Sequence, residues 1–291
     1  VIARFRSPGP LALALVLTTA GLSCVATNDM ALIMMLPLSA ATLMGANLPR
    51  LVAPVFVLQS LAANLCGMIV PFGNPQNLYL YSYYGLDLGD FLAAMALPFA
   101  LSTAGIVACT WWLCGQSNGS CGRDDTRSLA VPMPLSRRRL AIYGALVALT
   151  LLAVFRIVPV AAAVAVVAAA LAALDRRALA AVDWGLLATF ACFFVFAGNL
   201  ARVPEVSAWL SPLMADHGLL VSAGLSQIIS NVPAAVLLSH FTGAWQPLLV
   251  GVNIGGAGTL VGSLASLITL QHFTSVRKIF PRATALPELS T

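Results

Sequence analysis

Five consecutive residues inside an apolar stretch combine helix-breaking and amide side chains: Gly73, Asn74, Pro75, Gln76 and Asn77. Glycine and proline interrupt helices, which frees backbone N–H and C=O groups. Asparagine and glutamine add neutral donors and acceptors without the cost of a buried charge. A membrane helix broken here would present its two half-helix ends to a ligand. The pentad therefore predicts a binding site for a small solute, the alternative being a kink satisfied by neighbouring helices.

A second stretch resembles the first. "ANLCGMIVPFGNPQNL" (63–78) can be laid on "VNIGGAGTLVGSLASL" (252–267). The superposition pairs Asn64 with Asn253, Gly67 with Gly256, Gly73 with Gly262, Asn74 with Ser263 and Asn77 with Ser266. We interpret both stretches as broken membrane helices, with close helix packing as the other reading of Gly256 and Gly258.

Each of these stretches follows a hairpin-like segment with a polar tip. The tips are Thr27-Asn28-Asp29 and Ser230-Asn231. Asp29 is the only acid in either tip, and a carboxylate at membrane depth indicates a function such as cation coordination or proton transfer. Helix capping is the alternative at both tips.

Composition places the chain in the membrane. It has 291 residues, of which 60% are hydrophobic and 9% are charged, whereas soluble proteins carry about 25% charged residues. Several windows of about 20 residues lack any charge, which is enough to span the hydrocarbon core. We therefore predict an all-α polytopic membrane protein. The net charge of +5 then reports topology, and we expect no nucleic-acid partner.

The same survey excludes other classes of function. The six cysteines form no CxxC motif, so they are expected to pack in the core. No HExxH motif is present, which argues against an intramembrane enzyme. The sequence shows no acidic filter of the kind that would indicate a channel.

The predicted elements form two repeats. The first (1–114) holds a hairpin at 11–44, a broken helix at 51–80 and a helix at 91–113. A loop at 115–138 follows. The second (139–273) holds helices at 140–155, 157–174 and 184–201, a hairpin at 204–241 and a broken helix at 247–273, before a tail at 274–291.

Basic residues set the expected orientation. They gather in cytoplasmic loops, so we place the arginine-rich loop 115–138 and the C-terminus in the cytoplasm of a multi-pass cell-membrane protein. The first hairpin then opens from inside and the second from outside. This requires each hairpin to return to the side of the membrane on which it started, either as a re-entrant hairpin or as two full spans. The result is an inverted-topology repeat, the arrangement that marks a transporter's binding site.

Four motifs together, "TNDMALIMMLPLS", "PFGNPQNLYLY", "ISNVPAAVLL" and "GGAGTLVGSLASLI", resemble the ion transporter superfamily. That group contains arsenite permeases, NhaD-type sodium–proton antiporters and citrate or dicarboxylate symporters, and the nearest likeness is to its uncharacterised, arsenite-permease-like inner membrane branch. The resemblance implies two re-entrant hairpins and two broken helices. It also implies that about 100 residues precede Val1 and that one helix follows Thr291, by analogy with the repeats of such proteins.

The expected activity is secondary transport of a small anion, an inorganic oxyanion or a carboxylate, coupled to Na⁺ or H⁺. Na⁺/H⁺ exchange is the alternative. The expected binding residues are Thr27, Asn28, Asp29, Asn64, Gly73, Asn74, Pro75, Gln76, Asn77, Ser230, Asn231, Pro233, Asn253, Gly256, Gly258, Thr259 and Ser263. Na⁺ could bind at Asn28, Asp29, Asn74 and Asn231. No cofactor is expected beyond the coupling ion, and the partners are a small anionic solute and the lipid bilayer, with a homodimer as an option.

Overall fold

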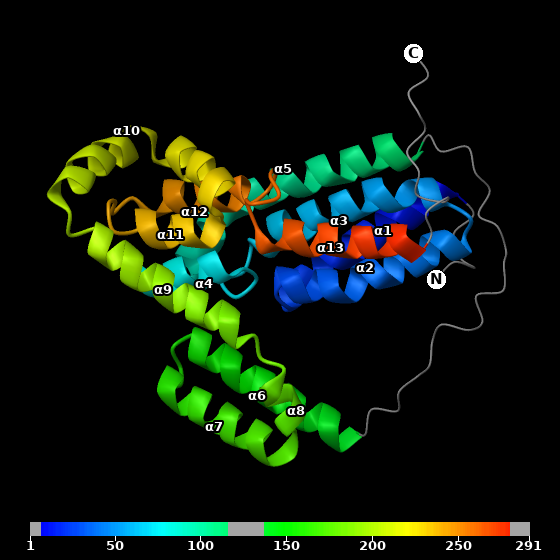
Figure 1. The fold of residues 1–291 in the computed structure, drawn as a ribbon, viewed down its shortest axis with the longest axis horizontal. Helices are drawn as coiled ribbons and strands as arrows, with labels where there is room; N and C mark the ends of the chain where they lie inside the picture. The colour runs from blue at the N-terminus through cyan, green and yellow to red at the C-terminus, as the bar shows by residue number, and fades with distance from the viewer. Residues whose placement is uncertain (1–6, 116–136, 280–291) are drawn as a thin grey trace. The chain divides into compact units, whose positions relative to one another are not determined.

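The computed structural model describes residues 7–115 and 137–279, and within these ranges every regular element is a helix (Figure 1). The chain divides into a larger unit, Val1–Thr126 with Phe194–Thr291, and a smaller unit, Arg127–Phe193. Most of the loop predicted at 115–138, and the end of the predicted tail at 274–291, lie outside the described residues.

The larger unit contains ten complete helices among its described residues. They are α1 (Pro8–Val25), α2 (Asn28–Gly45), the short 3-10 helix η2 (Pro49–Leu51), α3 (Val52–Gly67), α4 (Pro75–Tyr83), α5 (Leu88–Gly115), α10 (Pro204–Ile229), α11 (Asn231–Leu238), α12 (Trp245–Gly255) and α13 (Leu264–Ile279). The smaller unit contains α6 (Arg137–Val154), α7 (Val160–Leu174) and α8 (Arg176–Ala180), and α9 (Trp184–Leu200) begins there and ends in the larger unit.

One half of the larger unit is a bundle of α1, α2 and α3 with α13 lying along it (Figure 1). Its core holds fully buried side chains such as Leu11, Leu36 and Phe56. The Phe56 ring meets the Phe273 ring edge-on, with the ring centroids 6.4 Å apart. A late helix of the chain thus completes the core of its first three helices.

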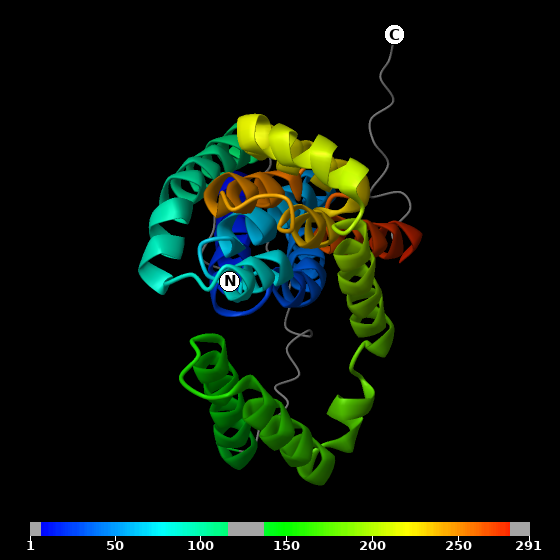
Figure 2. The same cartoon turned by 90° about the vertical axis from the view of Figure 1, so that its left-hand side faces the viewer.

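The other half is built in the reciprocal way. Helices α10, α11 and α12 pack together, with α10 lying along α12 (Figure 2), and α4 from the early part of the chain completes them. Leu80 of α4 is buried in one cluster with Leu238 of α11 and Leu248 of α12. Each half therefore contains one hairpin and the helix after it, closed by a helix from the opposite end of the chain.

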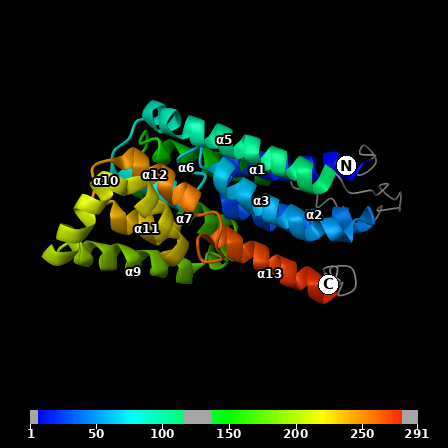
Figure 3. The same ribbon diagram turned by 90° about the horizontal axis from the view of Figure 1, so that it is seen from above.

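Helix α5 runs beside α1 and α3 (Figure 3) and also contacts α12. Phe91 and Met95 at its start are fully buried, whereas Leu97 and Leu101 are about two-thirds exposed, at 67% and 65%. A face of large exposed apolar side chains on a 28-residue helix suits contact with lipid tails.

Four helical stretches of the described chain are long and apolar enough to cross a membrane: Pro8–Val25, Asn28–Gly45, Pro49–Gly67 and Leu88–Gly115. A fifth candidate is the pair Leu187–Leu200 and Pro204–Ile229, bent by 97°. Helix α11 has 8 residues and covers about 12 Å at 1.5 Å per residue, well short of the hydrocarbon core of about 30 Å. The all-helical, multi-pass character agrees with the prediction from composition.

Candidate polar site at the two helix breaks

The first break lies between Gly67, where α3 ends, and Pro75, where α4 begins. Glycine is required at position 73, because a Cβ there would stand 2.0 Å from the Gly67 carbonyl oxygen. The Gly73 carbonyl accepts a hydrogen bond of 3.0 Å from the backbone N–H of Asn28. The first tip is therefore joined to the first break through the backbone.

The second break lies between Gly255, where α12 ends, and Leu264, where α13 begins. Here the Gly262 carbonyl accepts a hydrogen bond of 2.9 Å from the backbone N–H of Asn231. This is the same contact as at the first break: an asparagine of the tip donates to a glycine of the break, and the sequence comparison pairs the two glycines. The Asn231 side chain fills the space beside Gly256, where a Cβ would stand 2.7 Å from its amide nitrogen.

Two buried asparagines connect the breaks to each other. Asn64, near the end of α3, donates from Nδ2 to the Gly256 carbonyl and to Ser263 Oγ, both at 2.8 Å. Asn253, near the end of α12, accepts at Oδ1 from Asn74 Nδ2 at 3.1 Å and from Gln76 Nε2 at 3.0 Å. Each helix thus reaches the break that interrupts the other helix.

Backbone carbonyls fix which end of each amide is the donor. Asn253 Nδ2 donates to the Leu249 carbonyl at 2.8 Å and to Asn77 Oδ1 at 2.6 Å, so its oxygen must be the acceptor. Asn74 Nδ2 also donates to the Asn64 carbonyl at 3.2 Å. With their nitrogens committed to donation, Asn74 and Gln76 can turn only their oxygens elsewhere.

Within the described residues those oxygens have no partner. Asn74 Oδ1 and Gln76 Oε1 are buried and receive no hydrogen bond from the described chain, and the same holds for Asp29 Oδ1. Buried acceptors are ordinarily paired, so each unpaired one requires an explanation. The spare capacity of the first break and the first tip is therefore for accepting hydrogen bonds or coordinating a cation, not for donating to an anion.

The comparison with protein families gives a match over residues 1–249 to the family described as "Citrate transporter". The chain belongs to the citrate transporter family. The inner membrane protein YbiR of Escherichia coli is 32% identical over 275 residues, covering 93% of this chain and 72% of YbiR. The uncharacterized transporter MJ0456 of Methanocaldococcus jannaschii is 33% identical over 261 residues, covering 89% and 70%. No solved structure matches. The chain is thus a multi-pass membrane transporter and not an enzyme.

Two further side-chain donors in this citrate transporter family member were missed from the sequence. Cys24 Sγ donates to the Cys66 carbonyl at 3.5 Å, and Gln227 Nε2 donates to the Gly255 and Ala257 carbonyls at 2.7 and 2.6 Å. Both donors follow the same tetrapeptide, Ala-Gly-Leu-Ser, at 20–23 and 223–226. That identity, four residues before each polar tip, was the signal that could have found them.

The structure distributes the other predicted residues unevenly. Asn28 belongs to the network, because its Nδ2 donates to Asn64 Oδ1 at 3.1 Å and its Oδ1 accepts from the Asp29 N–H at 2.8 Å. Thr27 is exposed and caps α2, accepting from the Met30 N–H at 3.5 Å. Thr259 is exposed and bonded to backbone, donating to the Gln227 carbonyl at 3.0 Å.

Three more of the predicted residues have conformational roles. Pro75 occupies the first turn of α4, where no N–H is needed. Pro233 is buried in the first turn of α11. Gly258 has φ +131°, a conformation that favours glycine, and lies against the Gln227 side chain.

Ser230 stands at the second tip with φ 78°, which is a strained value for a residue with a Cβ. Its Oγ lies 3.5 Å from Asn231 Oδ1 and 3.5 Å from the Gly262 carbonyl. Within the described chain no group of three or more His, Cys, Asp or Glu side chains could hold a metal. The site is therefore built from amides, hydroxyls and backbone groups, with one carboxylate, Asp29, next to Asn28 in the first tip.

Proposed function

We propose that the chain carries the solute- and cation-binding centre of a secondary active transporter for a small carboxylate such as citrate, coupled to Na⁺. The citrate transporter family membership supports the class of solute. The single observation that carries the proposal is the buried network in which Asn64 and Asn253 each bond to the other helix's break.

An inverted repeat accounts for the pairing of these contacts. Asn28 N–H to the Gly73 carbonyl has its counterpart in Asn231 N–H to the Gly262 carbonyl. The packing of the helices that follow the breaks is reciprocal as well: α4 packs on α11 and α12, and α13 packs on α2 and α3. In transporters of this kind the broken helices of the two repeats meet at the midplane and hold the solute there.

The unpaired oxygens favour a cation at the first break. Asp29 Oδ1, Asn74 Oδ1 and Gln76 Oε1 offer one carboxylate and two amide oxygens, the ligand type that hard cations prefer. A carboxylate solute cannot bind to acceptor oxygens alone. Na⁺ would supply the positive charge that the neutral amides lack, which gives a physical reason for solute and cation to bind together.

The experiment is uptake of labelled citrate by proteoliposomes that contain the full-length protein, driven by an inward Na⁺ gradient. We expect uptake to fall at least tenfold in Asp29→Asn and in Asn231→Ala. The matched controls are Asp90→Asn, on the exposed first turn of α5, and Asn199→Ala, on the exposed face of α9, which should keep uptake near the wild-type rate. Wild-type rates in both site variants would reject the proposed centre.

Na⁺/H⁺ exchange is the second candidate, because Asp29 is the one acid in the site. It predicts Na⁺-driven pH change inside vesicles without any carboxylate present, abolished by Asp29→Asn. Placement of the loop 115–138 and of the C-terminus on the cytoplasmic side of the cell membrane belongs to the same proposal and rests on the distribution of arginines.

A further inference from the structure

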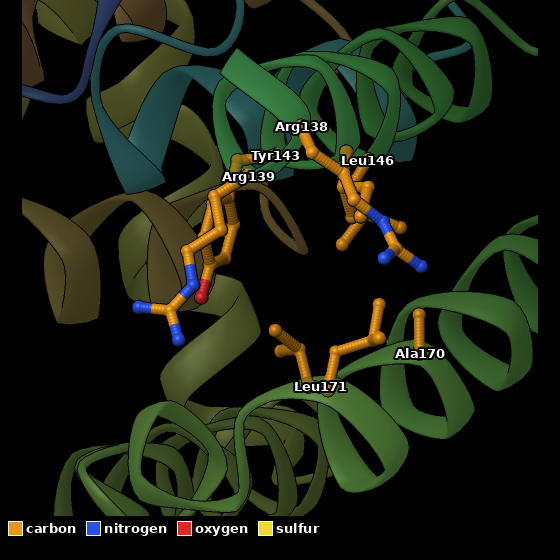
Figure 4. A pocket seen from close by; sticks show the side chains of 8 residues that line it. Arg138, Arg139, Tyr143, Leu146, Ala170 and Leu171 are labelled. Atoms are coloured by element: carbon orange, nitrogen blue, oxygen red, sulfur yellow. The ribbon is translucent and has the colours of Figure 1, made fainter. Parts of the chain in front are cut away.

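The smaller unit holds a groove between α6 and α7 that the transport proposal does not use. It is lined on α6 by Arg138, Arg139, Ile142, Tyr143 and Leu146, and on α7 by Ala170, Leu171 and Leu174, with a volume of about 320 Å³. Figure 4 shows the two arginines and Tyr143 on one side of the groove and Ala170 and Leu171 on the other.

The groove follows from the sequence of the two helices. Helix α7 reads "VAAAVAVVAAALAAL", and its many alanines leave a shallow surface beside the longer side chains of α6. At the end of the pair the Tyr143 hydroxyl donates to Asp175 Oδ2 at 2.6 Å, which ties α6 to the residue that follows α7. The helices are therefore held together at this end while an apolar channel stays open between them.

The same end carries a concentrated positive charge. The start of α6 supplies Arg137, Arg138 and Arg139, and Arg176 and Arg177 follow α7. Asp175 lies next to Arg176, and both of its oxygens are engaged, since Oδ1 accepts from the Ala178 N–H at 3.1 Å. The hydrogen bond from Tyr143 keeps the pKa of Asp175 below its ordinary value, so the group stays ionised at neutral pH. These five arginines outnumber the two acids of the described part of the smaller unit, Asp175 and Asp183.

A polar, cationic mouth above an apolar channel matches one occupant best. Arginine binds phosphate oxygens through a planar, bidentate fork, and the walls below are aliphatic. By the positive-inside rule this end faces the cytoplasm, where the leaflet is rich in anionic lipid. We propose that the α6–α7 groove binds an anionic phospholipid, with its phosphate on Arg138 and one acyl chain along Ile142, Leu146 and Leu171.

The test is native mass spectrometry of the full-length protein, released from neutral detergent and titrated with phosphatidylglycerol or with phosphatidylcholine of the same chain length. We expect one phosphatidylglycerol to bind at least tenfold more tightly than phosphatidylcholine. Arg138→Gln with Arg139→Gln should remove that preference. Arg277→Gln with Lys278→Gln removes two charges from the last turn of α13 instead and should leave it intact.

A second pair of variants separates a seated lipid from diffuse attraction. Leu171→Trp fills the groove without changing charge and should reduce phosphatidylglycerol binding at least fivefold, whereas Val164→Trp, on the exposed face of α7, should not. Glycerol 3-phosphate and inorganic phosphate at millimolar concentration should not compete, because they lack the acyl chain.

Three results would overturn the proposal. Equal binding of the two lipids would exclude headgroup recognition. Equal losses in the two double variants would show that only overall charge matters. Displacement of the lipid by inorganic phosphate would assign the groove to a free anion instead of a lipid.

Discussion

Replacing Asn253 by alanine should destabilise the larger unit more than replacing any asparagine that lies outside the network. Asn253 is 1% exposed and makes four hydrogen bonds, with Asn74, Gln76, Asn77 and the Leu249 carbonyl. Among the described contacts, its removal leaves Gln76 Nε2 and Asn77 Oδ1 buried without a partner, whereas Asn74 Nδ2 keeps the Asn64 carbonyl.

Two estimates bound the cost in free energy of unfolding. Hydrogen bonds between helices in membrane proteins average about 0.6 kcal/mol each. The three that Asn253 makes outside its own helix therefore give a lower bound of about 2 kcal/mol. Leaving a buried polar group unpaired costs roughly 1–3 kcal/mol, so two such groups give an upper bound of about 6 kcal/mol. At roughly 2–4 °C per kcal/mol for a chain of this size, we expect the melting temperature to fall by about 10 °C.

The assay is thermal unfolding of the full-length protein in detergent, followed by intrinsic fluorescence, without Na⁺ or carboxylate. Asn199→Ala is the matched control, because Asn199 is exposed and its side chain donates to the Val195 carbonyl of its own helix. Its effect should stay within about 0.5 kcal/mol. A melting temperature for Asn253→Ala that equals that of Asn199→Ala would refute the argument that this network joins the two breaks.

Two further substitutions test the packing around the site. Gly73→Ala should prevent stable folding, because its Cβ would stand 2.0 Å from the Gly67 carbonyl oxygen. Gly89→Ala, with nothing within 4 Å of the added Cβ, should be neutral or stabilising by up to about 1 kcal/mol. The yields of monodisperse protein check this, and a normal yield of Gly73→Ala would contradict the close backbone approach at the first break. Tyr84→Phe should lower stability by about 1 kcal/mol, since its hydroxyl donates to the Ser239 and Thr242 carbonyls at 3.2 and 2.7 Å. Tyr83→Phe, which loses only an exposed contact with His240, should cost less in the same melting assay. The reverse order would be evidence against this contact between the residues that follow α4 and those that follow α11.

Much of the fold could be predicted from the sequence, because membrane helices are recognised by their length and their lack of charged residues. Charge-free windows predicted an all-helical membrane protein, and the glycines and amides at 73–77 marked a place where a helix could not continue. These signals are local. They depend on backbone conformation and on the cost of polar groups in lipid, which a single segment is enough to reveal.

The arrangement of the site was not accessible in the same way. Asn64 and Gly256 are 192 positions apart in the chain, and no local pattern indicates that one donates to the other. The unpaired oxygens of Asn74 and Gln76 emerge only when every competing donor has been traced. The tyrosines at 79, 83 and 84 bond to the end of the second hairpin at Ser239, His240 and Thr242, and no local pattern indicates these contacts either.

The central claim is that the first tip and the two breaks form one centre that binds Na⁺. It is tested most directly by the melting temperature of the full-length protein in NaCl and in choline chloride at equal ionic strength. A bound ion stabilises only the folded state, so we predict a higher melting temperature in NaCl for the wild type and for Asp90→Asn, and no difference between the salts for Asp29→Asn. Equal melting temperatures for the wild type in both salts, or a Na⁺ effect that survives in Asp29→Asn, would contradict the account.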